Sequence, residues 1–368
     1  MRVMHVTFDM RIGGTEMVIK NIIEGNTDAN IEMSIYCIEA PLGPWGEDLK
    51  ASGTPIAVEE RQPGFDKSLI NKIRKHIKDN DIDILHCHQY TPWVYGTLAA
   101  AFTKTKVIFT EHGRFYPDSS SWKRKLVNPV LNKFTSAVTA ISEATRDALV
   151  EFECMKKSDI DVAYNGIKPL EPSTGELSAL KISLGLPENA LVFGTVARLD
   201  PIKNQSLLIE AFAEAEKYIA EAYLLIVGDG ELMTSLNAQV ERLGLQHKVI
   251  FTGYKANPTN YLAIMDVFLL PSLSEGTSMT LLEAMSIGKP CVVTNAGGNP
   301  EIVTHSKTGL VTANDNQEEL KEALITISES EKMRASFSES AIARFYELFH
   351  VNKMMAQYSK IYKKVLEN

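Results

Sequence analysis

The sequence predicts an α/β protein with two doubly wound parallel sheets. Short apolar runs alternate with amphipathic stretches along most of the chain, and the alternation breaks once, near the middle. Such alternation is typical of parallel strands joined by helices that cover both faces of a sheet. With 368 residues the chain is long enough for two domains of ordinary size.

In the first half, the apolar runs predict buried strands, and the stretches between them have helical periodicity. The predicted strands are 2–8, 32–38, 56–58, 83–88, 106–110, 137–141 and 160–162, and the clearest helices are 14–24, 66–78 and 143–152. The pattern breaks at 164–175, which is rich in Pro, Ser, Gly and Glu. We therefore predict a first domain over 1–165 and a second that begins at 166.

The second half repeats the alternation, so 166–349 is expected to form another doubly wound domain. The predicted strands are 191–196, 223–227, 249–252, 267–270, 291–294 and 310–311. After 317 the chain is polar and helical. Its last stretch, about 350–368, predicts a helix with one apolar stripe, made of Met354, Met355, Tyr358, Ile361, Tyr362 and Val365.

Composition and charge exclude several classes of protein. The chain is 45% hydrophobic and 23% charged, which is typical of a globular protein, and no apolar run approaches the length of about 18 residues that a membrane span requires. The formal net charge of −8 argues against nucleic-acid binding. The four cysteines show no Cys-x-x-Cys spacing, and residues 1–8 resemble a first strand more than a secretory signal. We expect a cytoplasmic protein with reduced cysteines.

The most informative loop lies within 271–288. An apolar strand at 267–270 ends at Pro271, and a helix with apolar periodicity begins near Met279. A helix that starts at the carboxyl end of a parallel strand offers unpaired N–H groups and a positive dipole end. The loop therefore predicts an anionic ligand.

Two carboxylates flank this loop. Glu275 would repel a bare phosphate, so we expect it to bind hydroxyl groups attached to the anion, and a sugar phosphate carries both. The alternative is that Glu275 is a solvated loop residue and that Glu283 closes a capping box with Thr280.

The motif around these carboxylates resembles the signature of a known family. Glu275 and Glu283 have seven residues between them and stand in Ser-Glu-Gly-Thr and Glu-Ala-Met-Ser-Ile-Gly-Lys-Pro. This pattern is similar to that of retaining glycosyltransferases of family 4, which have the GT-B fold, and the resemblance runs from Gly13 and Gly14 to the last helix. It implies two Rossmann-like domains that face each other across a deep cleft, with the last helix crossing back to the N-terminal domain.

The resemblance also implies a reaction. The first domain would bind the acceptor and the second a nucleotide-sugar donor, a UDP-sugar in preference to GDP-mannose. A sugar would move to an acceptor hydroxyl with retention of configuration, as in polysaccharide or glycolipid biosynthesis. No residue stands out as a covalent nucleophile, so attack on the face of the leaving group is expected.

Individual roles follow from the same resemblance. Arg198 and Lys203, at the end of the strand 191–196, would converge on the departing diphosphate, so no metal and no other cofactor is expected. Glu275 would hold the donor sugar, Glu283 the ribose hydroxyls, and His112 a sugar hydroxyl. The other expected donor-binding residues are Gly13, Gly14, Gly228, Gly253, Tyr254, Gly276, Thr277 and Ser278.

On the acceptor side we expect His88 and Arg114. His86 and His88 lie two apart on one face of a predicted strand, which suggests a metal pair. The sequence offers no convincing third ligand, so we predict no metal site.

Three other functions are compatible with parts of the sequence. A nicotinamide enzyme would use the Gly13-Gly14 turn and Glu39, but Met17 stands where a third glycine is wanted. A sugar-nucleotide epimerase shares the two-domain plan and needs no acceptor. A non-catalytic module would bind the nucleotide sugar without turnover.

One stretch is basic in an otherwise acidic chain. Residues 121–134 alternate Lys and Arg with apolar side chains, which predicts a helix with a basic and an apolar face. Such a helix could rest on an anionic membrane surface and bring the enzyme to a lipid-linked acceptor. The alternative is that the apolar face packs on the sheet, and Pro129 would then bend or end the helix.

Overall fold

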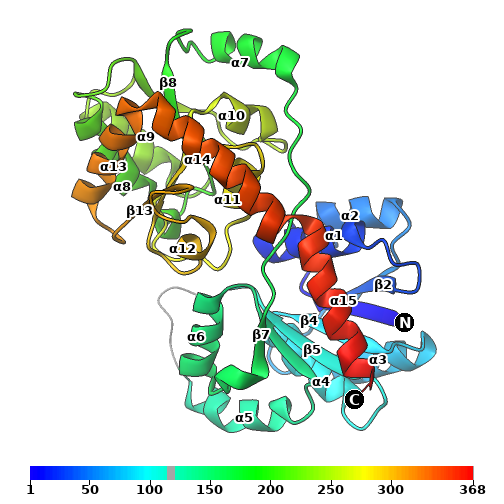
Figure 1. Cartoon of the computed structure of the whole chain (residues 1–368). Helices are drawn as coiled ribbons and strands as arrows, with labels where there is room; N and C mark the ends of the chain where they lie inside the picture. The colour runs from blue at the N-terminus through cyan, green and yellow to red at the C-terminus, as the bar shows by residue number, and fades with distance from the viewer. Residues whose placement is uncertain (114–120, 368) are drawn as a thin grey trace. The chain divides into compact units, whose positions relative to one another are not determined.

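The computed structural model describes residues 1–113 and 121–367, and the chain divides into two units (Figure 1). The first unit contains Met1–Ile167 together with His350–Asn368, and the second contains Lys168–Phe349. The sequence placed the boundary at 165, close to this division. The C-terminal segment belongs with the first unit.

The first unit contains a fully parallel sheet in the order β3-β2-β1-β4-β5-β6-β7. Its strands are β1 (Arg2–Thr7), β2 (Glu32–Cys37), β3 (Ile56–Val58), β4 (Ile84–His88), β5 (Lys106–Glu111), β6 (Ala137–Ala140) and β7 (Ile160–Val162). The direction of winding reverses between β1 and β4, which is where doubly wound sheets bind ligands.

Helices cover both faces of this sheet. They are α1 (Gly14–Gly25), α2 (Pro44–Ala51), α3 (Lys67–Asp79), α4 (Tyr90–Ala100), α5 (Trp122–Asn132), α6 (Glu143–Glu153), the short η1 (Lys157–Asp159) and α15 (Val351–Glu367). The core beneath them includes Trp93 of α4, whose ring stacks on Phe109 of β5 at 4.5 Å between centroids. Its indole N–H donates to Thr135 Oγ1, so the polar atom of this buried side chain is satisfied.

The second unit contains a parallel sheet in the order β10-β9-β8-β11-β12-β13. Its strands are β8 (Leu191–Val196), β9 (Ala222–Val227), β10 (Val249–Phe251), β11 (Val267–Leu270), β12 (Cys291–Thr294) and β13 (Gly309–Thr312). Its helical segments are η2 (Thr174–Glu176), α7 (Leu177–Ser183), η3 (Pro201–Lys203), α8 (Gln205–Ala215), α9 (Met233–Arg242), α10 (Thr259–Ile264), α11 (Met279–Ser286), α12 (Asn299–Ile302), α13 (Gln317–Glu329), α14 (Glu331–Arg344) and η4 (Phe345–Phe349).

The predicted fold class is confirmed. Every strand lies within one residue of a predicted apolar run, because a parallel strand that is buried on both faces is apolar along its length. The described cysteines are free, and only Cys154 is exposed; the reduced state expected from the sequence stays a prediction. Within the described ranges, the structure contains no helix with the length and apolar character of a membrane span.

The last helix packs on the first sheet through its apolar stripe. All six predicted stripe residues of α15 are buried. Val351 N donates to Ile167 O, which ties the start of the helix to the end of the first unit's main segment. Tyr362 reaches the core of the sheet, where its hydroxyl lies 2.9 Å from His86 Nδ1.

The contact between α1 and α15 gives a first prediction. A Cβ on Gly25 would lie 2.5 Å from Val351 Cγ2 and 3.2 Å from Met355 Cγ. We predict that Gly25→Ala lowers the free energy of unfolding by about 1 to 3 kcal/mol, because the added methyl group overpacks this contact. Denaturant unfolding measures the change. Gly175→Ala is the control, since nothing lies within 4 Å of its Cβ, and equal destabilisation of both variants would contradict this packing.

Candidate active site

The loop between β11 and α11 is fixed by its backbone contacts. Ser278 is the N-cap of α11, and its Oγ accepts a hydrogen bond from Leu281 N. Gly298 N donates to Glu275 O at 3.1 Å. Gly297 has φ of +51°, and a Cβ there would lie 1.8 Å from Glu275 O, so only glycine fits. The backbone at Glu275 is therefore held in one position.

Lys203 and Glu275 form a part-buried ion pair at this loop. Lys203 Nζ donates to Glu275 Oε1 at 2.7 Å, and the same oxygen accepts from Ser272 Oγ at 2.6 Å. The Glu275 side chain is 8% exposed, whereas Lys203 is 24% exposed. The two residues follow β8 and β11, which are adjacent in the sheet. The carboxylate is thus fixed by two donors, while the ammonium still reaches solvent.

Arg198 has a carboxylate partner of its own. Its Nε donates to Asp200 Oδ2 at 2.6 Å, and Asp200 Oδ1 accepts from the backbone N–H groups of Ile202 and Lys203. The sequence predicted that Arg198 and Lys203 converge on one anion, but the structure gives each cation a carboxylate. Sequence reasoning missed Asp200, although it stands between them. Arg198 is 75% exposed and remains open to a ligand.

Glu283 is placed differently from Glu275. The capping-box alternative is wrong, because Ser278 is the N-cap and its partner is Leu281 N. Among the described residues, no side chain or backbone group donates to the Glu283 carboxyl group. Burial raises its pKa from 4.5 to about 7, since desolvation disfavours the charged form. Hydroxyl donors from a ligand would relieve that desolvation.

Two glycine turns lie at the carboxyl ends of β9 and β10. Gly228 N donates to Gly253 O at 3.1 Å, and the two residues form an antiparallel bridge. Gly228 has φ of +146°, and a Cβ there would lie 1.9 Å from Ala197 O. Tyr254, next to the second turn, is exposed. The turns bring backbone close to the end of β8, on the edge of the sheet that holds Lys203.

In the first unit, Gly13 is the N-cap of α1, and Gly14 is its first residue. The space around Gly14 is open, since nothing lies within 4 Å of an added Cβ. Glu16 lies in the first turn, and burial raises the pKa of its carboxyl group, with nearby Asp9 as a smaller cause. A diphosphate at this turn would meet backbone N–H groups and a carboxyl group whose pKa is raised.

His112 follows β5 and is connected to His88. Its Nε2 lies 2.7 Å from His88 Nδ1, and His88 Nε2 lies 2.9 Å from His5 Nδ1. His88 is fully buried with both ring nitrogens hydrogen-bonded, and its place on the acceptor side stays a prediction. Sequence reasoning missed His5, which is distant in sequence but lies on β1, the neighbour of β4 in the sheet. The other acceptor-side residue, Arg114, lies outside the described residues.

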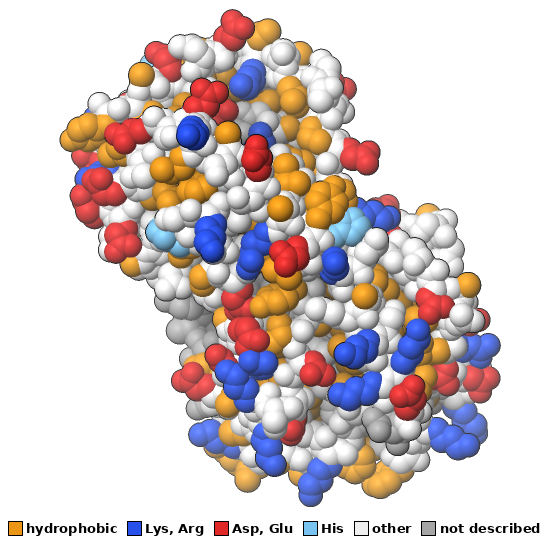
Figure 2. Space-filling model, in the orientation of Figure 1, with side chains coloured by type: hydrophobic (Ala, Val, Ile, Leu, Met, Phe, Trp, Pro, Cys, Tyr) orange, Lys and Arg blue, Asp and Glu red, His pale blue; other side chains and the backbone are white. Residues whose placement is uncertain are grey.

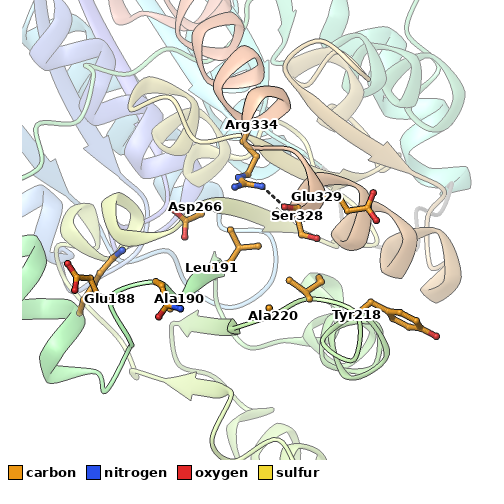
Figure 3. Close-up of a pocket in the computed structure, with 12 residues that line it drawn as sticks. Glu188, Ala190, Leu191, Tyr218, Ala220, Asp266, Ser328, Glu329 and Arg334 are labelled. Carbon is orange, nitrogen blue, oxygen red and sulfur yellow. Dashed lines mark hydrogen bonds between the residues drawn. The ribbon is translucent and has the colours of Figure 1, made fainter.

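A hollow on the second unit lies away from these residues (Figure 3). It has a volume of about 500 Å³ and borders Leu191, at the start of β8, and Asp266, just before β11. Arg334 points across it and donates to Ser328 O at 2.7 Å. Doubly wound sheets bind ligands at the carboxyl ends of their strands, whereas this hollow is at the amino ends. We assign no substrate to it.

Comparisons with known proteins agree with this arrangement. The family model described as Glycosyltransferase Family 4 matches residues 12–169, and the model described as Glycosyl transferases group 1 matches residues 178–344. The chain belongs to these glycosyltransferases and has the GT-B fold.

Individual proteins are similar over nearly the whole chain. The N-acetyl-alpha-D-glucosaminyl L-malate synthase of Bacillus anthracis is 28% identical over 83% of this chain and 81% of its own. The UDP-Gal:alpha-D-GlcNAc-diphosphoundecaprenol alpha-1,3-galactosyltransferase of Escherichia coli is 27% identical over 100% of this chain and 98% of its own. The structure of Anabaena HepE in complex with UDP has a TM-score of 0.88 at 24% identity, and the match covers 99% of this chain and 100% of that one.

The raised pKa of Glu283 predicts a pH-dependent stability. The folded state holds this proton more tightly than the unfolded chain, so stability is lost as pH rises from 4.5 to about 7. Glu283→Gln should therefore be more stable than the wild type by on the order of 2 to 3 kcal/mol at pH 8 and equal to it near pH 4. Unfolding titrations at the two pH values measure this. Glu241→Gln, at an exposed site, should show no such difference, and a pH-independent effect of Glu283→Gln would refute the desolvation.

Proposed function

We propose that this glycosyltransferase moves a sugar from a nucleotide-diphosphate donor to an acceptor hydroxyl with retention of configuration. A UDP-sugar is the favoured donor, and GDP-mannose is the alternative. The observation that carries the proposal is the segment after β11, which contains Glu275 of the Lys203–Glu275 ion pair, the start of α11 and Glu283. Glu283 is desolvated and accepts no hydrogen bond from the residues that the structure describes. That combination suits a ligand with an anionic centre and several hydroxyl groups.

Charge stabilisation is the main catalytic contribution of these residues. Arg198 and Lys203 neutralise the diphosphate as it departs, together with the N–H groups around Thr277 and Ser278. Because two cations are present at this edge of the sheet, the proposal requires no metal ion. Glu283 accepts hydrogen bonds from ribose hydroxyls in its charged form.

Glu275 holds the donor sugar in this proposal. One of its oxygens is occupied by Lys203 and Ser272, which leaves the other oxygen for a sugar hydroxyl. A carboxylate so engaged is a weak nucleophile, and this supports attack by the acceptor on the face of the leaving group. His112 offers a ring nitrogen to a sugar hydroxyl.

Release of nucleoside diphosphate tests the function. The protein is incubated with UDP-glucose, UDP-galactose, UDP-N-acetylglucosamine or GDP-mannose, with and without candidate sugar and lipid-linked acceptors. Acceptor-dependent release from one donor supports the transferase. Conversion of the donor sugar without any acceptor would indicate an epimerase, and binding without release or conversion would indicate a non-catalytic module.

The exposed Arg198 allows a sharp mutational test. We predict that Arg198→Ala lowers turnover by about a hundredfold or more, the scale on which one preorganised charge-stabilising group acts. Arg198 is mostly exposed, so the variant should fold normally. The matched control is Lys217→Ala, which removes an exposed cation of the same unit. Turnover of Arg198→Ala within a few-fold of the control would disprove the role. Lys203→Ala is a less direct test, because it would leave the buried carboxylate of Glu275 without its cation.

The acceptor side of the proposal rests on α5. Most of its apolar side chains do not pack on the sheet as the alternative required: Trp122 is 69% and Leu126 66% exposed, with Val127 and Val130 exposed as well. Leu131 is the apolar residue of α5 that does join the core of the first unit. Pro129 lies inside the helix without ending it. In Figure 2, basic and hydrophobic side chains lie next to each other along the edge of the first unit where α5 lies in Figure 1.

One basic residue of α5 is already engaged within the protein and is not available to bind a membrane surface. Arg124 donates to Glu153 at 2.6 Å, and its guanidinium lies 4.2 Å from the centre of the Tyr90 ring. Lys123, Lys125 and Lys133 are exposed. We propose that these lysines and the apolar face bind the anionic inner surface of the cytoplasmic membrane, where a lipid-linked acceptor is found. The E. coli relative is named for a diphosphoundecaprenol-linked acceptor.

Flotation with liposomes tests this surface. The wild type should float with vesicles that contain anionic lipid and less so as salt rises, and changing Lys123, Lys125 and Lys133 to Gln should reduce recovery, because each basic residue near the surface contributes about 1 kcal/mol. The control changes Lys72, Lys75 and Lys78 of α3 to Gln, with the same loss of charge. Equal recovery of the two triple variants, or equal flotation with neutral vesicles, would reject the membrane surface.

A further inference from the structure

Three histidines of the first unit form a row of hydrogen-bonded rings. His5, His88 and His112 come from β1, β4 and the end of β5, which are neighbours in the sheet. The ring nitrogens are 2.9 Å apart between His5 and His88 and 2.7 Å apart between His88 and His112. His5 and His88 are fully buried, and His112 is the member of the row that is partly exposed.

Counting protons restricts the states of this row. A neutral imidazole carries one proton, and each N···N hydrogen bond needs one. Three neutral rings thus have three protons for two bonds, and the third proton must sit at one end. Either all three rings carry it on Nδ1, so that His112 presents Nδ1–H, or all carry it on Nε2, so that His5 presents Nε2–H. The tautomers of the rings are therefore coupled.

The two ends differ in their access to a ligand. Within the described residues, His5 Nε2 and His112 Nδ1 are both buried and have no hydrogen-bond partner. His5 is fully buried on β1, whereas His112 is partly exposed and follows β5 at the carboxyl edge of the sheet, so a ligand can approach the row only at His112. A bound ligand can hydrogen-bond to His112 Nδ1 whether or not that atom carries the proton. The energy difference between the two states therefore depends on His5 Nε2, which has no partner in either. An unpaired buried N–H is less tolerated than an unpaired lone pair, which favours protons on Nδ1 throughout.

We propose that His5 and His88 are positioning residues that hold His112 as the Nδ1–H tautomer, so that His112 donates a hydrogen bond to an oxygen of the bound sugar. This deepens the proposed function, on which the identity of the ligand rests. In this tautomer His112 can only donate a hydrogen bond at Nδ1. It therefore accepts a sugar oxygen as its partner and excludes a ligand group that can only donate.

The surroundings of the row agree with neutral rings. Burial lowers the pKa of His5 and His112 to about 3, and the pKa of His88 is lowered well below its usual range by burial and by the neighbouring histidines. The proton count therefore applies near neutral pH. His86 is close by but outside the row, since its nitrogens face Tyr362 and Thr110.

A metal site is the competing use of these side chains. One nitrogen from each of His5, His86 and His88 lies within 4.8 Å of the others, so the third ligand that the sequence lacked is present. Coordination would require lone pairs from all three rings. Both nitrogens of His86 and both of His88 are already hydrogen-bonded, so a metal would break several bonds in a fully buried place. The hydrogen-bonded row is the better use of this geometry.

Nitrogen NMR of the ring nitrogens tests the proposal without any substrate. The intact protein is labelled with ¹⁵N-histidine, and at pH 7 the two nitrogens of each ring distinguish the tautomers. We expect Nδ1–H with a bare Nε2 in His5, His88 and His112. A single Nε2–H state, a mixture or a doubly protonated ring in His112 would overturn the proposal. If the spectrum is unchanged after Zn²⁺ is added, the hydrogen-bonded row is supported. Shifts of the ring nitrogens of His5 and His88 that indicate coordination would show a metal site instead.

A pair of variants separates positioning from general packing. His88→Phe removes the donor to His112, and we expect His112 to lose its single Nδ1–H state. His86→Gln changes an equally buried neighbour on the same strand and should leave His112 unchanged. If His112 keeps Nδ1–H in His88→Phe, the positioning role is wrong. Should that variant not fold, the wild-type spectrum still decides the tautomer. Because neither experiment needs a nucleotide sugar, the outcome is independent of whether the transferase proposal holds.

Discussion

The parallel direction of the strands is the constraint on which both candidate sites depend. In each unit all paired strands run the same way, so their carboxyl ends meet at one edge. Residues distant in sequence thereby become neighbours: Lys203 follows β8 and Glu275 follows β11, and His88 ends β4 where His112 follows β5. His88 and His112 lie at or just beyond adjacent strand ends, whereas Lys203 reaches Glu275 from the end of η3, a short helical turn that Asp200 caps.

Polar groups at these edges are held before any ligand arrives. Glu275 is fixed by Lys203 and Ser272, Arg198 by Asp200, and His112 by His88. Such preorganisation is what electrostatic catalysis needs, because groups that are already oriented require no rearrangement when charge develops. Glu283 is the exception, since it is desolvated and unpaired among the described residues. A ligand with hydroxyl groups would complete its surroundings.

The sequence predicted the sheets well and the pairings poorly. Strand positions followed from continuous apolar runs, and the stripe of α15 from helical periodicity, because both patterns are local. The role of His5 was missed, since its partner is defined by sheet register and not by spacing along the chain. Asp200 is only two residues from Arg198, but the sequence does not show that the turn points the two side chains at each other. His5 faces His86 only because β1 and β4 are adjacent. Pro129 also lies inside α5, because context outweighed the usual preference against proline in a helix interior.

Binding of UDP to Glu283 variants tests the central claim most directly, because the claim is that this carboxylate holds the ribose of a nucleotide sugar. Calorimetric titration with UDP at pH 8, where Glu283 is mostly ionised, compares the wild type with Glu283→Gln and with the exposed Glu241→Gln. The account predicts a loss of about 1.5 to 3 kcal/mol in binding free energy for Glu283→Gln, the strength of a hydrogen bond to a charged group, and no loss for the control. Equal affinity of the wild type and Glu283→Gln for UDP would contradict it.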